Sequence, residues 1–137
     1  HIKKKPILGI CVGMQILANS SEEGKIDGLG WIPGKVKKFK KEELKRLNLY
    51  LPHMGWNSIE ENNNKHKLLQ NIDFKEGFYF LHSYYFQPEF NSHTLAFSKY
   101  DSPFSCIVGY QNIYGVQFHP EKSHNNGVQL LLNFANI

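Results

Sequence analysis

One apolar run organises this chain: Ile7-Leu8-Gly9-Ile10-Cys11-Val12-Gly13-Met14-Gln15, in which Cys11 has a glycine two residues away on each side. The pattern predicts a strand, a sharp turn with Cys11 at its apex, and a helix over residues 12–18. Such an elbow holds a nucleophile in a strained backbone conformation, and Gly9 and Gly13 would be small because strand and helix approach closely there. The first N–H groups of the helix favour a thiolate and can bind an oxyanion. We therefore expect a site for attack on a carbonyl carbon.

The glycine spacing alone also fits a second interpretation. Cys11 would then be a small buried apolar residue at a tight turn, as many free cysteines are. A histidine base elsewhere in the chain would favour the nucleophile.

Length and composition limit what the elbow can belong to. The chain has 137 residues, of which 41% are hydrophobic and 14% aromatic, so we expect one domain over residues 1–137 with a single core. Two cysteines imply no disulfide framework and favour a reducing compartment. No apolar run approaches the roughly 20 residues of a membrane span, so we expect no membrane contact and a cytoplasmic location.

The net charge of +4 is modest, but positive charge is concentrated in one short stretch. Its members are Lys35, Lys37, Lys38, Lys40, Lys41, Lys45 and Arg46. Nucleic-acid binding is one explanation, but no nucleic-acid motif accompanies the charge. The interleaved apolar residues favour a strand and a short helix with solvated faces, and we expect no nucleic-acid partner.

Strand and helix patterns alternate along the rest of the chain, without repeats or low-complexity tracts. Turn-rich residues 51–57 suggest a constrained loop before a short strand at 57–59, and residues 60–65 a polar loop. The other predicted strands are 36–39, 77–86, 94–98, 105–110 and 114–118, and the predicted helices are 66–71 and 127–134. His82, Ser83 and Tyr84 place polar atoms at a strand end, where ligands often bind in open α/β sheets. Cys106 falls within a strand, so we expect it to be structural.

A partner for Cys11 occurs far downstream, in Gly115-Val116-Gln117-Phe118-His119-Pro120-Glu121. Residues i and i+2 of an extended segment point the same way, so His119 and Glu121 can lie side by side. A histidine takes the thiol proton and a carboxylate holds its tautomer. Metal binding is the rival interpretation, but the other histidines show no ligand spacing, so we expect no metal and no cofactor.

Together these two segments resemble the class I (triad) glutamine amidotransferases. Within that family, further blocks are similar to the glutaminase subunits of imidazole glycerol phosphate synthase. They are residues 20–24, 28–34, 52–57, 82–85 and 115–123. The resemblance implies a three-layer, Rossmann-like α/β domain with a mixed central sheet.

The resemblance also implies roles for individual residues. Cys11 would attack the side-chain amide of L-glutamine, His119 would move protons, and Glu121 would orient His119. A glutamyl thioester on Cys11 would be hydrolysed to glutamate. Glutamine would be bound at Gly13, Gln15, Ser83 and Tyr84, with the backbone N–H of Val12 as an oxyanion donor.

Family members pass the ammonia to a (β/α)8-barrel synthase subunit in histidine biosynthesis. By the same matching, the surface facing that partner comprises Pro52, His53, Met54, Gly55, Trp56, Asn57 and Lys122. A core position is the alternative for Trp56.

Family members also have strands, a helix and a glycine-rich oxyanion loop before the elbow, whereas Cys11 lies near the start of this sequence. We therefore expect an N-terminally truncated domain that is a poor glutaminase alone. Two other functions stay open: a degenerate binding or regulatory module, and an amidotransferase that supplies a different synthase, such as one modifying a surface sugar.

Overall fold

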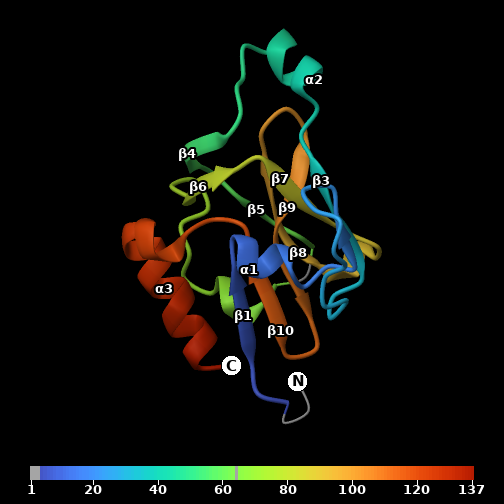
Figure 1. Ribbon diagram of the computed structural model, residues 1–137. Coiled ribbons are helices and arrows are strands. Elements are labelled where there is room, and N and C mark those ends of the chain that lie inside the picture. Colours follow the sequence, from blue (N-terminus) through green and yellow to red (C-terminus); the bar gives the residue numbers. More distant parts are fainter. Residues whose placement is uncertain (1–3, 64) are drawn as a thin grey trace.

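The computed structural model describes residues 4–63 and 65–137, and its centre is a curled mixed sheet (Figure 1). The strands of this sheet are β1 (Ile7–Ile10), β2 (Ser20–Ser21), β3 (Gly34–Lys38), β5 (Glu60–Glu61), β7 (Tyr84–Pro88), β8 (Thr94–Lys99), β9 (Pro103–Tyr110) and β10 (Ile113–Val116). Their order is β1-β10-β9-β7-β3-β2, with β8 beside β9 and β5 beside β8. β1 runs parallel to β10 and β2 parallel to β3, whereas the other pairs are antiparallel.

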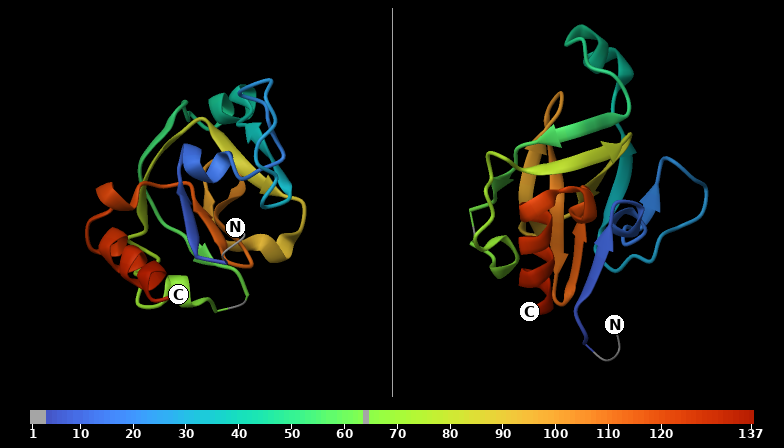
Figure 2. Two further views of the ribbon diagram at one scale, coloured as in Figure 1. Left: turned by 60° about the horizontal axis from the view of Figure 1, so that its bottom comes forward. Right: turned by 90° about the vertical axis from the view of Figure 1, so that its left-hand side faces the viewer.

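A separate two-stranded ribbon lies across one end of this sheet (Figure 2). It consists of β4 (His53–Asn57) and β6 (Phe78–His82), which pair antiparallel with His53 opposite His82. Alternate residues of a strand point to opposite faces. Phe78 and Phe80 accordingly face the core, whereas Met54 and Trp56 are exposed.

The helices cover different sides of the central strands, as Figure 2 shows for α1 and α3. They are α1 (Val12–Gln15), α2 (Lys41–Arg46) and α3 (His124–Ala135), together with the 3₁₀ turns η1 (Lys67–Leu69), η2 (Asn91–His93) and η3 (Pro120–Lys122). One buried cluster includes Leu130 of α3 together with Phe118, and a second includes Met14 of α1 and Phe86 of β7. Hydrophobic cores on both faces of a mixed sheet confirm the predicted α/β fold class. No helix among the described residues has the length and apolarity that a membrane span requires.

Two predicted elements are wrong in kind or extent. The loop predicted at 51–57, before a strand at 57–59, is instead largely β4, which already begins at His53 and ends at Asn57. Gly55 has φ 118°, a conformation that favours glycine, and it keeps its place opposite Phe80 in the ribbon. The single strand predicted at 77–86 is divided at Ser83, so that β6 joins the ribbon and β7 the main sheet.

The remaining predictions hold with shifted ends. The helix expected over 12–18 is shorter, the helix at 66–71 is the 3₁₀ turn η1, and the loop at 60–65 begins with β5; residue 64 lies outside the described residues. The other expected strands and the C-terminal helix correspond to β3, β8, β9, β10 and α3. The basic stretch forms β3 and α2, whose buried residues include Val36 and Leu44, so a strand and a helix with solvated lysines are confirmed.

The two glycines that flank Cys11 differ in the space available for a larger side chain. A Cβ on Gly9 would lie 2.3 Å from the carbonyl oxygen of Gly13, because β1 and α1 touch at this point. A Cβ on Gly13 would have nothing within 4 Å. The predicted packing role is therefore confirmed for Gly9 and wrong for Gly13.

Two buried histidines join the strands of the ribbon. His82 Nδ1 lies 2.7 Å from the Tyr84 carbonyl oxygen, so Nδ1 carries the proton and Nε2 accepts from His53 Nδ1 at 2.8 Å. His53 Nε2 in turn accepts from Asn57 Nδ2 at 3.2 Å. Burial lowers the pKa of His53 to about 4 and that of His82, which also faces His53 and His119, to about 3. Both imidazoles are therefore neutral in the folded protein at neutral pH.

The glycine pair gives a matched test of the contact between β1 and α1. Gly9→Ala should lower the free energy of unfolding by about 2 kcal/mol, because the new methyl group overlaps helix backbone that cannot move aside. Gly13→Ala should stay within about 1 kcal/mol of the parent, since its methyl group enters open space. Urea unfolding measures both, and equal losses would contradict the close contact at Gly9.

The histidine pair makes the fold acid-sensitive. In the unfolded chain both imidazoles take up protons near pH 6.5, but in the folded protein only near pH 4 and 3. The unfolded chain therefore binds more protons between these values, so the free energy of unfolding is fully present above pH 6.5 and falls as the pH falls toward 3.

We expect His82→Gln to lose less stability than the parent between pH 7 and pH 5, with proton uptake on unfolding reduced by about one. The neighbouring exposed Asn125, which carries no titratable group, serves as the control when changed to glutamine and should leave the slope unchanged. Urea unfolding across this pH range gives the slope. A slope unaffected by His82→Gln would refute a neutral buried pair.

Candidate active site

Cys11 lies at a strained turn between β1 and α1. Its backbone has φ 52° and ψ −109°, outside the regions that non-glycine residues favour. Its N–H donates to the Val116 carbonyl oxygen at 2.8 Å, and its own carbonyl accepts from Met14 and Gln15 of α1. The predicted elbow with Cys11 at its apex is therefore confirmed.

The sulfur of Cys11 is half-buried beside β6. Its S–H lies 3.8 Å from the Leu81 carbonyl oxygen, and the amide Nε2 of Gln117 donates to the sulfur at 3.7 Å. Burial raises the pKa of the thiol, and hydrogen bonding to the Val12 N–H and to Gln117 offsets only part of that rise. The expected preference for thiolate is therefore wrong for this structure, in which the neutral thiol is favoured.

His119 and Glu121 form a close pair. His119 Nδ1 lies 2.6 Å from Glu121 Oε1, with the histidine largely buried and the carboxylate half-exposed. The predicted pairing is confirmed, but its cause differs from the expected one. Glu121 belongs to the 3₁₀ turn η3, so the chain bends after His119 instead of continuing extended. With Nδ1 donating to the carboxylate, Nε2 of His119 is left with a lone pair that can accept a proton.

Strand β6 holds the cysteine and the histidine along one edge. The Tyr79 carbonyl oxygen accepts the backbone N–H of His119 at 2.9 Å, and the Leu81 carbonyl oxygen accepts the thiol of Cys11. Carbonyls two residues apart point the same way on a strand and are about 7 Å apart. Among the described residues, the sulfur has no hydrogen bond to His119, so the structure holds the two groups near each other without a bond between them.

A pocket of about 290 Å³ opens beside Cys11. Five of the predicted substrate-site and docking residues line it together with the cysteine: Val12, Gln15, Ser83, Tyr84 and Pro52. The lining omits Gly13, His119 and Glu121. It adds Glu23, Leu81 and His82, of which only His82 is marked by the sequence, as part of the polar group at a strand end. Within the described ranges, no group of three or more histidine, cysteine or acidic side chains is placed to hold a metal ion.

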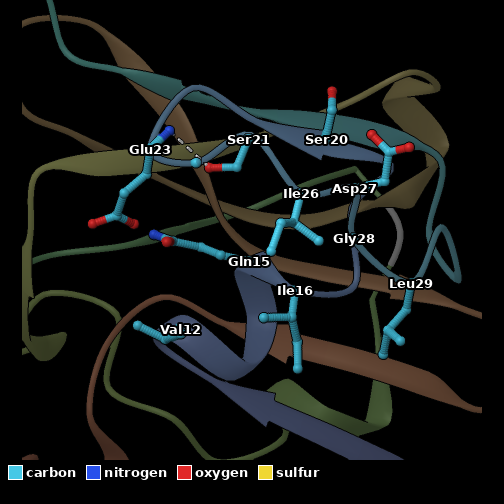
Figure 3. A pocket seen from close by; sticks show the side chains of 11 residues that line it. Val12, Gln15, Ile16, Ser20, Ser21, Glu23, Ile26, Asp27, Gly28 and Leu29 are labelled. Atoms are coloured by element: carbon cyan, nitrogen blue, oxygen red, sulfur yellow. Dashed lines mark hydrogen bonds between the residues drawn. The ribbon is translucent and has the colours of Figure 1, made fainter.

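A second pocket of about 470 Å³ adjoins the first, and Figure 3 shows its lining. Val12, Gln15 and Glu23 line both pockets. Ile16 at the C-terminal end of α1 and Ile26 in the loop after β2 give the second pocket an apolar wall, which the sequence reasoning did not assign to a site.

The side chain of Gln15 is turned toward the interior. Its Nε2 donates to the Tyr84 carbonyl oxygen at 3.2 Å and to Gln117 Oε1 at 3.1 Å, which uses both of its hydrogens. Gln117 is completely buried and is not among the predicted site residues. Only the tertiary fold reveals it, because 102 residues of chain separate it from Gln15.

The predicted docking residues divide by exposure. Pro52, Met54, Trp56 and Lys122 are exposed, which rules out the core alternative for Trp56. His53 is 4% exposed, so its assignment to a docking surface is wrong, because the odd positions of β4 face the core. Asn57 is half-buried and donates to Lys99 and His53.

Comparison with known proteins agrees with this geometry. The chain matches the model of the class I glutamine amidotransferase family over residues 1–136. The imidazole glycerol phosphate synthase subunit HisH of Leptospira interrogans is 55% identical over 98% of this chain and 65% of that protein. HisH of Neisseria meningitidis serogroup A is 50% identical over 98% of this chain and 64% of that protein. The chain thus spans slightly less than two thirds of the length of these relatives.

A solved structure extends the comparison to the fold. It is a Thermoplasma acidophilum protein provisionally assigned as a GMP synthase component, which superposes with a TM-score of 0.67 at 22% identity, over 96% of this chain and 56% of that one. At that identity the likeness concerns the fold alone. The family match extends over nearly the whole chain and fits the cysteine elbow and the His119–Glu121 pair: this chain belongs to the class I glutamine amidotransferases.

Proposed function

We propose that this chain carries the glutaminase centre of an imidazole glycerol phosphate synthase in histidine biosynthesis. The observation that carries the proposal is the placement of Cys11 and the His119–Glu121 pair along one edge of β6. The HisH relatives, at about half identity, support this synthase over one that modifies a surface sugar. The intact cysteine, histidine and carboxylate favour a catalyst over a regulatory module.

In the proposed reaction, His119 takes the thiol proton through Nε2, and the sulfur of Cys11 attacks the side-chain amide carbon of glutamine. The sulfur must first leave the Leu81 carbonyl, a change of partner that substrate binding would bring about. His119 then gives the proton to the departing ammonia, leaving a thioester on Cys11. Water, deprotonated by His119, hydrolyses the thioester to glutamate, while Glu121 stabilises the imidazolium.

Glutamine would occupy the pocket beside Cys11. The hydrogens of Gln15 Nε2 are already bonded, so Gln15 would offer Oε1 as an acceptor for the α-ammonium group. Ser83 and Tyr84 would bind the α-carboxylate, and the N–H of Val12 would stabilise the oxyanion. Open space beside Gly13 leaves room for substrate at the start of α1.

The partner would be a (β/α)8-barrel synthase subunit that receives the ammonia. Met54 and Trp56 form an exposed apolar face on β4, and the Trp56 ring packs against His124. Lys122, whose Nζ lies 5.8 Å from the Tyr79 ring centre, adds a positive charge at the same face. Exposed tryptophan and methionine side chains are typical of the core of a protein interface, and a charge such as that of Lys122 is typical of its polar rim. The two free thiols fit the cytoplasm, where we place the reaction.

Covalent labelling tests the glutaminase centre. A diazo-ketone analogue of glutamine, incubated with the protein and a barrel synthase, should add its mass to Cys11 alone. Cys11→Ser should abolish the adduct, and His119→Asn should slow its formation at least 100-fold, because the thiol loses its base. Peptide mass spectrometry locates the adduct.

Cys106→Ser is the matched control for this experiment and should label like the parent, since Cys106 is completely buried. An adduct that survives Cys11→Ser would contradict the proposal. Absence of the adduct would also contradict the proposal if the protein tested carries the N-terminal segment that its relatives have.

The docking face has its own test. Trp56→Ala should weaken binding to the barrel synthase at least tenfold, because a central aromatic anchor is lost, and Met54→Ala should have a smaller effect. Phe90→Ala, which removes an aromatic ring that is 51% exposed elsewhere, should leave affinity unchanged. Calorimetric titration gives the dissociation constants. Equal effects of Trp56→Ala and Phe90→Ala would argue against this face.

A further inference from the structure

Gln117 is a fully buried carboxamide directly behind the reactive sulfur. It follows the last residue of β10, and its backbone N–H donates to the Cys106 carbonyl oxygen at 2.9 Å. A polar group without access to water must find partners inside the protein. The side chain of Gln117 has two: Nε2 donates to Cys11 Sγ at 3.7 Å, and Oε1 accepts from Gln15 at 3.1 Å.

The orientation of this amide follows from its neighbours. The Tyr84 carbonyl oxygen can only accept hydrogen bonds, so Gln15 must turn its Nε2 toward it. The second hydrogen of the same nitrogen then points at the amide of Gln117, which must accept it through Oε1. The amino group of Gln117 is thereby directed at the sulfur. The Tyr84 carbonyl is itself held by His82 at 2.7 Å, so the arrangement is fixed from both sides.

We propose that Gln117 is a further catalytic residue, whose amide N–H donates to the Cys11 sulfur and stabilises the thiolate during attack. Gln15 is a positioning residue that acts through Gln117 by fixing its amide. This inference rests on the proposed glutaminase function; it adds Gln117 to the machinery and gives Gln15 a second role.

The physical basis is the difference between thiol and thiolate as acceptors. A hydrogen bond to an anion is about twice as strong as one to a neutral group, so the amide of Gln117 favours the thiolate. Burial acts in the opposite direction and raises the pKa of the Cys11 thiol. The negative charge of Glu121 raises the pKa of the thiol further, so forming the thiolate requires a hydrogen-bond donor beside the sulfur. Gln117 meets this need without adding a charge to the core.

The test measures the alkylation rate of Cys11 by iodoacetamide as a function of pH, with peptide mass spectrometry as the readout. Gln117→Met keeps the length of the side chain but removes the donor. It should raise the apparent pKa of Cys11 by about one pH unit and slow alkylation about tenfold at pH 7. Gln117→Glu, which places an acceptor against the sulfur, should have a larger effect. The exposed Gln87, changed to methionine, is the matched control and should behave like the parent.

Cys106 reports on folding in the same experiment, because its thiol is completely buried and reacts only when the core opens. If Gln117→Met exposes Cys106, the variant Gln15→Met is used in place of Gln117→Met. Gln15→Met releases the amide of Gln117 and should shift the pH profile of Cys11 alkylation in the same direction. An unchanged profile, with Cys106 still protected, overturns the proposal. Iodoacetamide does not require glutamine recognition, so this result is independent of labelling by the diazo-ketone, whose failure would count against the glutaminase function alone.

Discussion

The backbone turn at Cys11 is the constraint on which the rest of the site depends. A non-glycine residue at φ 52° costs on the order of 1–3 kcal/mol and persists only where its surroundings fix it. Here the N–H of Cys11 is held by Val116, its carbonyl caps α1, and Gly9 lets the strand touch the helix backbone. The sulfur is thereby directed away from the sheet toward β6.

Strand β6 organises the other half of the site. One of its edges pairs with β4, and carbonyls of the opposite edge accept from Cys11 and His119. Groups that are 108 positions apart in sequence are thus placed by one short, rigid element. Since β6 is buried through Phe78 and Phe80, its edge has a fixed position relative to the core cluster that contains Phe118 and Leu130.

The parts of the site that depend on local patterns could be predicted from the sequence. The glycine spacing predicted the turn at Cys11, and the two-residue spacing predicted the pairing of His119 and Glu121. Contacts between distant segments could not be predicted. Gln117 resembles any polar residue in a strand until the fold brings Gln15 and Cys11 to it. The pKa of the thiol depends on burial, which the elbow alone does not determine.

The prediction of a loop where the structure has β4 also failed because of a contact between distant segments. Proline, glycine and histidine within residues 52–55 are typical of a loop, and the strand exists only because β6 offers it a partner. The contact between His53 and His82 joins the two strands at one end of this ribbon. A slip of one residue along the ribbon would turn every side chain of β4 to the other face, sending Met54 and Trp56 inward and His53 to solvent. The hydrogen bond between the paired imidazoles therefore favours the observed alignment, because a slip of one residue would separate the two rings.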